Sequence, residues 1–167
     1  MRILVDSKQM KRCDSNTIEH FGIPSLVLME RAAMGVVEEI EKCFPAASAT
    51  NGILLVCGYG NNGGDGLAIA RMLWQKGYTV TVVMPPGEYN ISEETKVQMN
   101  ILEKYQIPIK SRIPNREFDM VVDALFGIGL TRDLTGLCLE YVLEMNDMRG
   151  RKVAVDIPSG INGDTGA

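Results

Sequence analysis

The order of apolar and polar positions along the chain changes character near Pro45. Before this proline, Ser7–Glu19 and Ser25–Cys43 show the three- and four-residue spacing of apolar positions that predicts amphipathic helices. After it, short apolar runs alternate with amphipathic segments, an order typical of strands that alternate with helices. The pattern therefore predicts a helical N-terminal extension followed by an α/β region.

Glycines and prolines divide the α/β region into its elements. The strands we expect are Gly52–Cys57, Tyr78–Met84, a short Ile107–Ile109, Phe118–Ala124 and Lys152–Ile157. The helices we expect between them are Gly64–Lys76, Ser92–Tyr105 and Gly136–Asp147. Strands and helices that alternate in this way form right-handed crossovers, so we expect a parallel sheet that helices cover on both faces.

Length, composition and charge narrow the class of protein. A chain of 167 residues suits one domain with a substantial core, so we expect residues 1–167 to form a single domain. The content of 46% apolar and 23% charged residues is that of a globular protein. Because the net charge is −4, the chain lacks the basic character that nucleic acid or an anionic membrane would select. Small molecules or other proteins are the expected partners.

The sequence also predicts where the protein works. The four cysteines are scattered without a C-x-x-C pair, which favours reduced thiols over a disulfide framework or a metal site. No early segment has the form of a signal peptide, and no apolar run approaches the ~20 residues of a membrane span. We therefore expect an intracellular protein in the cytoplasm, with no membrane partner.

The most informative segment is the loop Gly58–Gly66, which follows the apolar stretch Ile53–Cys57. Its first, third and sixth residues satisfy the G-x-G-x-x-G pattern of dinucleotide-binding domains. Such domains also carry an acidic residue at the end of the second strand, whereas that strand ends here in Val83–Pro86. Asp65 would repel a pyrophosphate, and no Gly-Lys-Ser/Thr follows as in a P-loop. The sequence therefore disfavours both an ordinary dinucleotide-binding loop and a P-loop.

Two other interpretations of this loop remain. In the first, Asn61 and Asn62 supply donors and acceptors, and the unpaired N–H groups of the following helix complete a cradle for a polyhydroxyl ligand, an anion or a cation. In the second, the loop is a tight turn whose asparagines bond to their own backbone. Nine consecutive residues of this kind favour the cradle.

Two further loops follow strands and belong to the same edge of the predicted sheet. They are Asp123–Gly129 and Asp156–Gly160. Either aspartate alone could cap its loop, but two of them beside an asparagine-rich loop favour a site. Oxygen atoms of Asn62, Asp123 and Ser159 would bring one formal negative charge to a cation. This charge suits K⁺ better than Mg²⁺ or Ca²⁺.

Taken together, these segments resemble those of NAD(P)H-hydrate epimerases. The matching residues are 28–33, 56–67, 123–130 and 155–166, and the resemblance runs from about Gln9 to the last residue. It implies a Rossmann-like three-layer αβα fold, often dimeric, with bound K⁺. It also implies epimerisation of the R and S forms of hydrated NADH and NADPH, called NADHX and NADPHX, at C6 of the nicotinamide ring. An ADP- or ATP-dependent NAD(P)H-hydrate dehydratase, fused to this domain in many bacteria, acts on the product.

The resemblance also assigns roles to residues of this chain. It implies that the potassium ion is held by Asn62, Asp123 and Ser159, and that Asp156 lies at the reacting ring. We expect Asp156 to act as the catalytic acid and base and as a counter-charge to a cationic intermediate. The implied substrate-binding residues are Asn61, Asn62, Gly63, Gly64, Asp65, Gly127, Ile128, Gly129, Leu130, Thr131, Arg132, Asp133 and Asp156.

One departure from the family and one rival function remain. Domains of this family continue for several tens of residues, with further strands and a lysine-bearing loop. We therefore expect that the C-terminal part of the domain is missing from this chain, which ends at Ala167. The same fold also serves as a non-catalytic nucleotide-binding or scaffold module. The presence of Asn62, Asp123, Asp156 and Ser159 favours the enzyme.

Overall fold

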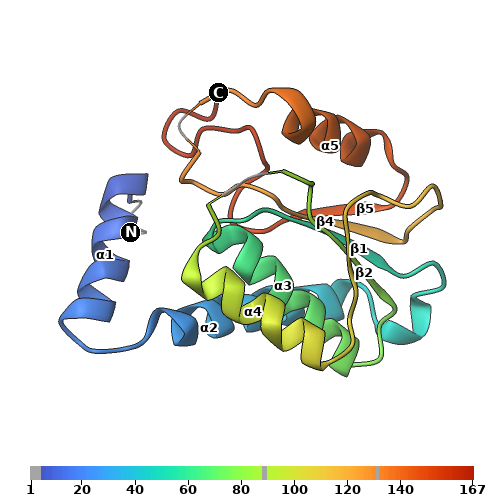
Figure 1. The fold of residues 1–167 in the computed structure, drawn as a ribbon, viewed down its shortest axis with the longest axis horizontal. Coiled ribbons are helices and arrows are strands. Elements are labelled where there is room, and N and C mark those ends of the chain that lie inside the picture. The colour runs from blue at the N-terminus through green and yellow to red at the C-terminus, as the bar shows by residue number, and fades with distance from the viewer. Residues whose placement is uncertain (1–4, 88–89, 131) are drawn as a thin grey trace.

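The structure of the chain, a computed structural model, describes residues 5–87, 90–130 and 132–167. In these residues five parallel strands form one sheet in the order β3-β2-β1-β4-β5 (Figure 1). The strands are β1 (Ile53–Cys57), β2 (Val80–Val83), β3 (Ile109–Lys110), β4 (Met120–Ala124) and β5 (Arg151–Ala154). The predicted parallel sheet is confirmed, although β3 begins two residues later than expected and β5 ends three residues earlier, at Ala154.

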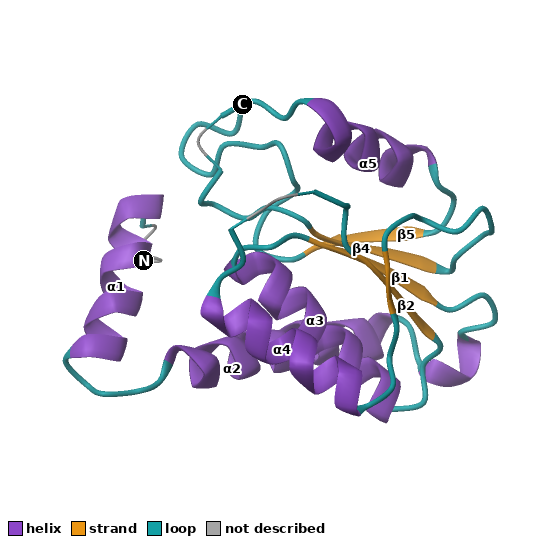
Figure 2. Cartoon of the chain, viewed as in Figure 1, coloured by secondary structure: helices purple, strands orange, loops and turns teal. Residues whose placement is uncertain are grey.

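Helices cover both faces of the sheet, as the α/β pattern predicts. Figure 2 shows α2, α3 and α4 on one face and α5 on the other. The α-helices are α1 (Ser7–Glu19), α2 (Ser25–Cys43), α3 (Asn61–Gln75), α4 (Glu93–Lys104) and α5 (Gly136–Asp147), and a short 3₁₀ helix covers Ala46–Ser48. The bounds of α1, α2 and α5 are those expected from the sequence. The fold is thus a three-layer αβα arrangement with an N-terminal helical extension.

Strand order reverses at the centre of the sheet. β1 pairs with β2 on one side and with β4 on the other, so the chain builds outward in both directions from β1. All five residues of β1 are buried, as expected for a strand between two layers of helices. In open parallel sheets ligands bind at such a reversal, outside the carboxyl ends of the strands. The sheet therefore has a crevice beyond Cys57 and Ala124.

The first helix stands outside the layers. All 13 residues of α1 are described and none is buried, and Figure 1 shows this helix beside the body of the molecule. A capping box at Asp6 and Gln9 stabilises its start. The backbone N–H of Ser7 donates to Asp164 Oδ1 over 2.8 Å, which ties this start to the C-terminal turn. No helix in the described ranges is both long and apolar enough to cross a bilayer.

The helix α3 differs most from the sequence-based expectation, because it begins at Asn61 rather than at Gly64. The N-terminal cap is Gly60, and Gly64 N–H already donates to the Gly60 carbonyl over 3.2 Å. Most of the predicted loop Gly58–Gly66 is therefore helix. Asparagine and glycine are weak helix formers, so local preference alone would not start a helix here.

Tertiary packing explains this early start, because glycine allows α3 to approach the sheet closely. A Cβ atom at Gly63 would overlap with the Gly58 carbonyl oxygen. One at Gly66 would lie 2.5 Å from Ala124 Cβ and 2.8 Å from Cys57 Sγ. These glycines bring the first turns of α3 against β1 and β4. The free energy gained from this close packing exceeds the cost of placing weak helix formers in a helix.

We expect Gly66→Ala to destabilise the fold by about 1–3 kcal/mol, because the added methyl group overpacks the contact with Ala124 and Cys57. The matched control is Gly35→Ala in α2, where an added Cβ meets no atom within 4 Å. That substitution should instead stabilise the helix by about 0.5–1 kcal/mol. Urea unfolding of both variants measures the two effects, and a Gly66→Ala protein as stable as wild type would contradict the packing argument.

Candidate functional site

Three segments that follow strands meet at the carboxyl edge of the sheet. They follow β1, β4 and β5, and because these strands are parallel their connections share one edge. The N–H of Gly58 donates to the Ala124 carbonyl over 3.0 Å, which joins the first two connections directly. The structure therefore brings the predicted site segments together from positions far apart in the sequence.

Asp123 and Ser159 join the connections that follow β4 and β5. Asp123 Oδ1 accepts from the Ser159 hydroxyl over 2.7 Å, and Oδ2 accepts from the Ser159 N–H over 2.8 Å. The Ser159 hydroxyl oxygen in turn accepts from Phe126 N–H over 2.9 Å. Ser159 is buried, so these bonds are shielded from water. Two of the three predicted ion ligands are thus in direct contact.

The third predicted ligand, Asn62, is half-buried, but both polar atoms of its amide are shielded from solvent and lack a partner. Neither Oδ1 nor Nδ2 has a hydrogen-bond partner among the described residues. A buried polar group left in this state costs roughly 1–3 kcal/mol, so such groups in native proteins usually meet a water, an ion or a ligand. The unpaired amide is the observation that fits a bound cation or substrate at this point.

The donor types also fit a monovalent ion. Asn62, Asp123 and Ser159 would offer oxygen atoms from the first turn of α3, the end of β4 and the connection after β5. One formal charge among them suits K⁺. No cluster of three His, Cys, Asp or Glu side chains occurs in the described ranges, so a multi-carboxylate divalent site has no counterpart there.

Asp156 lies at the same edge with an unusual backbone. Its φ of 68° is in the left-handed region, which non-glycine residues seldom adopt. Its Oδ2 accepts from Ile128 N–H over 2.8 Å. A Cβ atom at Gly127 would overlap with this oxygen and would come within 3.4 Å of Asn62. Glycine at position 127 therefore lets the predicted catalytic carboxylate sit beside Asn62.

A second carboxyl group, Asp65, belongs to the same site. It lies three residues after Asn62 on α3, so both side chains point from one face of the helix. Burial, followed by the negative charge of Asp156, raises the pKa of Asp65 from 3.8 to about 7. The two carboxyl groups are therefore close enough to influence each other, and Asp65 retains much of its proton near neutral pH.

The remaining predicted substrate-binding residues divide into two sets. Asn61, Gly129, Arg132 and Asp133 are exposed at the edge, where a ligand could reach them, and Leu130 is half-buried beside them. Gly63 and Gly64 are instead enclosed by protein, with Met29 and Thr95 against Gly64. Their side of α3 serves helix packing. Thr131 lies outside the described residues.

A cavity of about 260 Å³ lies at this edge, and most of its lining residues were given no individual role in the sequence analysis, although Tyr59 and Phe126 belong to loops singled out there. Its lining includes Tyr59, Pro85, Asn90, Phe126, Arg132 and Cys138, of which only Arg132 was predicted. The signal that could have found the others is position, because they lie on the connections that follow β1, β2 and β4 or at the start of α5. The Tyr59 hydroxyl donates to the Pro85 carbonyl over 2.8 Å.

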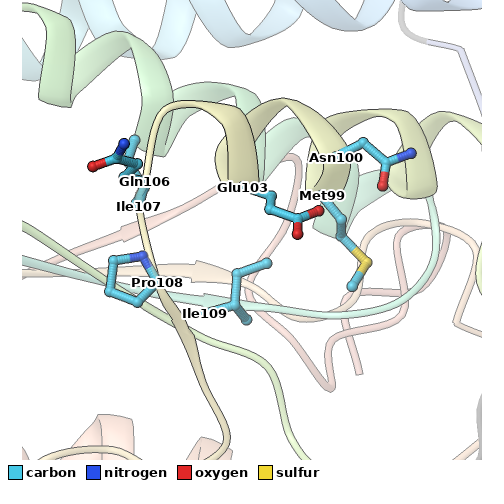
Figure 3. Close-up of a pocket in the computed structure, with 7 residues that line it drawn as sticks. All are labelled: Met99, Asn100, Glu103, Gln106, Ile107, Pro108 and Ile109. Carbon is cyan, nitrogen blue, oxygen red and sulfur yellow. The ribbon is translucent and has the colours of Figure 1, made fainter.

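A larger cavity of about 470 Å³ lies elsewhere, between the end of α4 and β3. Figure 3 shows Met99 and Glu103 on α4, with Pro108 just before β3 and Ile109 at its start. None of its lining residues belongs to the predicted site, and Glu103 is the only ionisable one among them. Size alone would favour this cavity, but the charged and unpaired polar groups lie at the carboxyl edge.

Comparison with known proteins bears directly on this site. The family model described as "YjeF-related protein N-terminus" matches residues 25–167. The NAD(P)H-hydrate epimerase of Limosilactobacillus fermentum is 44% identical over 164 residues, which cover 98% of this chain and 77% of that protein. The NAD(P)H-hydrate epimerase of Oenococcus oeni is 40% identical over 167 residues, with 98% and 78% covered.

A comparison with solved structures also finds a protein of similar fold. The crystal structure of the yeast protein ynu0 (YNL200c) superposes with a TM-score of 0.83 at 26% identity, covering 96% of this chain and 72% of the yeast chain. The chain therefore belongs to the family of the YjeF-related protein N-terminus, together with the NAD(P)H-hydrate epimerases that it resembles.

Proposed function

We propose that this chain is an isomerase that interconverts the R and S epimers of hydrated NADH and NADPH. The observation that carries the proposal is the Asp156 carboxylate, held by Ile128 N–H beside the unpaired amide of Asn62. It occurs in a chain 44% identical, over nearly its whole length, to a named NAD(P)H-hydrate epimerase. The left-handed backbone of Asp156 is of the kind that gathers at functional sites, which supports a role for this carboxylate.

The chemistry explains why a carboxylate is needed. Inversion at C6 breaks the C6–O bond as a proton moves to the leaving hydroxyl, and water then returns to the opposite face and gives up a proton. Ring opening would instead break the C6–N1 bond: the C6 hydroxyl gives up a proton, the ring nitrogen takes one, and the open-chain aldehyde then closes again on its other face. In the route through loss of water, protonated Asp156 gives its proton to the leaving hydroxyl, balances the positive charge of the ring as a carboxylate and takes a proton from the returning water. In the ring-opening route it would carry the proton between oxygen and nitrogen. The proton retained by Asp65 keeps a second negative charge away from Asp156.

A potassium ion belongs to the proposal. Asn62, Asp123 and Ser159 would hold it, supported by the unpaired Asn62 amide and by the Asp123–Ser159 contact. When bound, the ion supplies a fixed positive charge near the anionic substrate. Asn62, Asp123 and Ser159 belong to the segments that follow β1, β4 and β5, so the proposed ion would join these three segments.

The cellular setting follows from the reaction. A dehydratase that uses ADP or ATP and accepts one epimer would consume the product, in a separate chain or a fused one. Free NADH and NADPH are used in the cytoplasm, so we place the reaction there.

We also infer a homodimer. The helix α1 carries no buried residue, and on α2 the side chains of Val27 and Met34 are 46% and 51% exposed, so both helices offer apolar surface that a second copy could cover. Nucleic acid and membranes are not among the proposed partners.

The direct test mixes this chain with a stereospecific dehydratase and a racemic hydrate. Without the chain the slower epimer should persist, and with it both epimers should disappear. Asp156→Asn should lower the epimerisation rate by about 10²–10⁴-fold while substrate binding stays measurable. Asp147→Asn, an exposed aspartate at the end of α5, is the matched control. Persistence of the slower epimer with wild-type protein would leave only a binding function, and full turnover by Asp156→Asn would remove Asp156 from the mechanism.

The raised pKa of Asp65 predicts a specific dependence of stability on pH. Between about pH 4 and 7 the folded chain binds more protons at Asp65 than the unfolded chain does. The free energy of unfolding should therefore fall as the pH rises through this window. Asp65→Asn removes the effect, so its advantage over wild type should grow to about 2–4 kcal/mol at pH 8. Urea unfolding at pH 5 and pH 8 in potassium-free buffer measures it, and an equal difference at both pH values would contradict the argument.

The proposed ion site predicts a salt-specific gain in stability. An ion that binds only the folded chain stabilises it by RT ln(1 + [K⁺]/Kd), so at 100 mM KCl a millimolar Kd would give about 2–3 kcal/mol. Thermal unfolding in KCl should thus occur at a higher temperature than in choline chloride of equal concentration. Asn62→Ala should abolish the difference, whereas Asn61→Ala, at the exposed neighbouring position, should retain it. Equal unfolding temperatures in the two salts for wild type would refute the site.

A further inference from the structure

The 260 Å³ cavity is a second feature of the sheet edge, separate from the residues around Asp156. Its walls come from the connections after β1, β2 and β4, where strand order reverses. Asp156 lies on the opposite side of β4, after β5. The two places adjoin, because Phe126 lines the cavity and the next residue, Gly127, contacts Asp156. A ligand that spans both would cross the edge from β2 towards β5.

The size of the cavity limits what it can hold. Pockets that enclose a drug-sized ligand have volumes of ~300–1,000 Å³, and a dinucleotide is larger than most such ligands. A space of about 260 Å³ therefore suits one part of a dinucleotide, such as a base with its sugar. The rest of the substrate must lie outside this cavity.

The lining chemistry points to a nucleotide rather than to an uncharged ring alone. Tyr59, Phe126 and Pro85 provide flat, apolar surface of the kind on which bases stack. Asn90 adds an amide that can both donate and accept hydrogen bonds. Arg132 is the only charged side chain among the described lining residues, and it is exposed at the edge. An arginine beside aromatic walls suits a base that carries a phosphate.

The wall that contains Tyr59 is fixed before any ligand binds. The Tyr59 hydroxyl donates to the Pro85 carbonyl over 2.8 Å, which links the connections after β1 and β2. The Tyr59 carbonyl accepts from Ser92 N–H over 3.0 Å. The Gly60 carbonyl accepts from the Thr95 hydroxyl over 2.9 Å. The start of α4 thus holds both residues in place, and a preformed wall lowers the entropy lost on binding.

We propose that this cavity binds the adenylate half of the hydrated nucleotide and that Tyr59 is a specificity-determining residue for it. The inference rests on the proposed function and adds the orientation of the substrate, with adenylate towards β2 and the reacting ring at Asp156. Tyr59 supplies the stacking surface, and Arg132 faces the phosphate. Affinity for the half of the substrate that does not react thereby positions the half that does.

The first test needs no catalysis. Titration of the chain with 5′-AMP, followed by NMR, should shift the amide signals of Gly58, Gly60, Leu125 and Phe126 saturably. Tyr59→Leu should weaken AMP binding about tenfold, because loss of a stacking ring costs roughly 1–3 kcal/mol. Tyr59→Phe keeps the ring and should retain most of the affinity. The matched control Tyr105→Leu changes a tyrosine at the end of α4, outside the cavity. Shifts confined to other residues, or no shift with AMP at wild type, would overturn the proposal.

The second test uses the reaction itself and separates the two halves of the substrate. With NADHX, Tyr59→Leu should raise KM about tenfold and leave kcat within about twofold. With hydrated reduced nicotinamide mononucleotide, which lacks the adenylate, Tyr59→Leu and wild type should give the same KM when epimer ratios are followed by chromatography. A similar rise in KM for both substrates would place the reacting half in the cavity and overturn the proposal. An inactive chain that still binds AMP as predicted would instead contradict only the proposed function.

Discussion

The close approach of α3 to β1 and β4 is the constraint on which the rest of the site depends. Glycine at positions 63 and 66 removes the side chains that would hold the helix away, so the helix begins at once after the β1 connection. This early start places Asn62 and Asp65 on the first turns of α3 at the carboxyl edge. A helix displaced by one side-chain radius would carry both groups away from Asp156. The contact of α3 with β1 and β4 therefore both stabilises the core and places the polar groups of the site.

The site combines several groups that are unfavourable by themselves. The amide atoms of Asn62 are buried without a partner, Asp65 resists ionisation and Asp156 has a left-handed backbone. Each lowers the stability of the empty chain, and stabilising contacts elsewhere must offset them. The Asp123–Ser159 bonds and the fully buried strand β1 are such contacts. The coexistence of strained groups and a rigid frame is what a preorganised site requires, because little rearrangement remains when the ligand arrives.

The sequence predicted the fold well where local pattern and tertiary packing agree. The bounds of α1, α2 and α5 follow from apolar spacing, and the common edge of the site segments follows from parallel strands. The start of α3 was wrong by three residues, because packing against the sheet overrides the weak helix preference of asparagine and glycine. Tyr59 belongs to the loop singled out from the sequence but was given no role, since its place depends on a bond to Pro85, 26 positions later, which no local pattern records. Long-range contacts of this kind become visible only in three dimensions.

The bonds between Asp123 and Ser159 also set the order in which the chain can mature. These residues are 36 positions apart, and they meet only after β5 has paired with β4 at the edge of the sheet. Contacts between distant positions form late, because a long loop must close before they contribute. Nearly all buried core residues precede Ser159 in the chain, so the core is encoded before the residue that completes this edge. The segment around Ser159 therefore completes the proposed ligand edge on a core that the preceding strands and helices build.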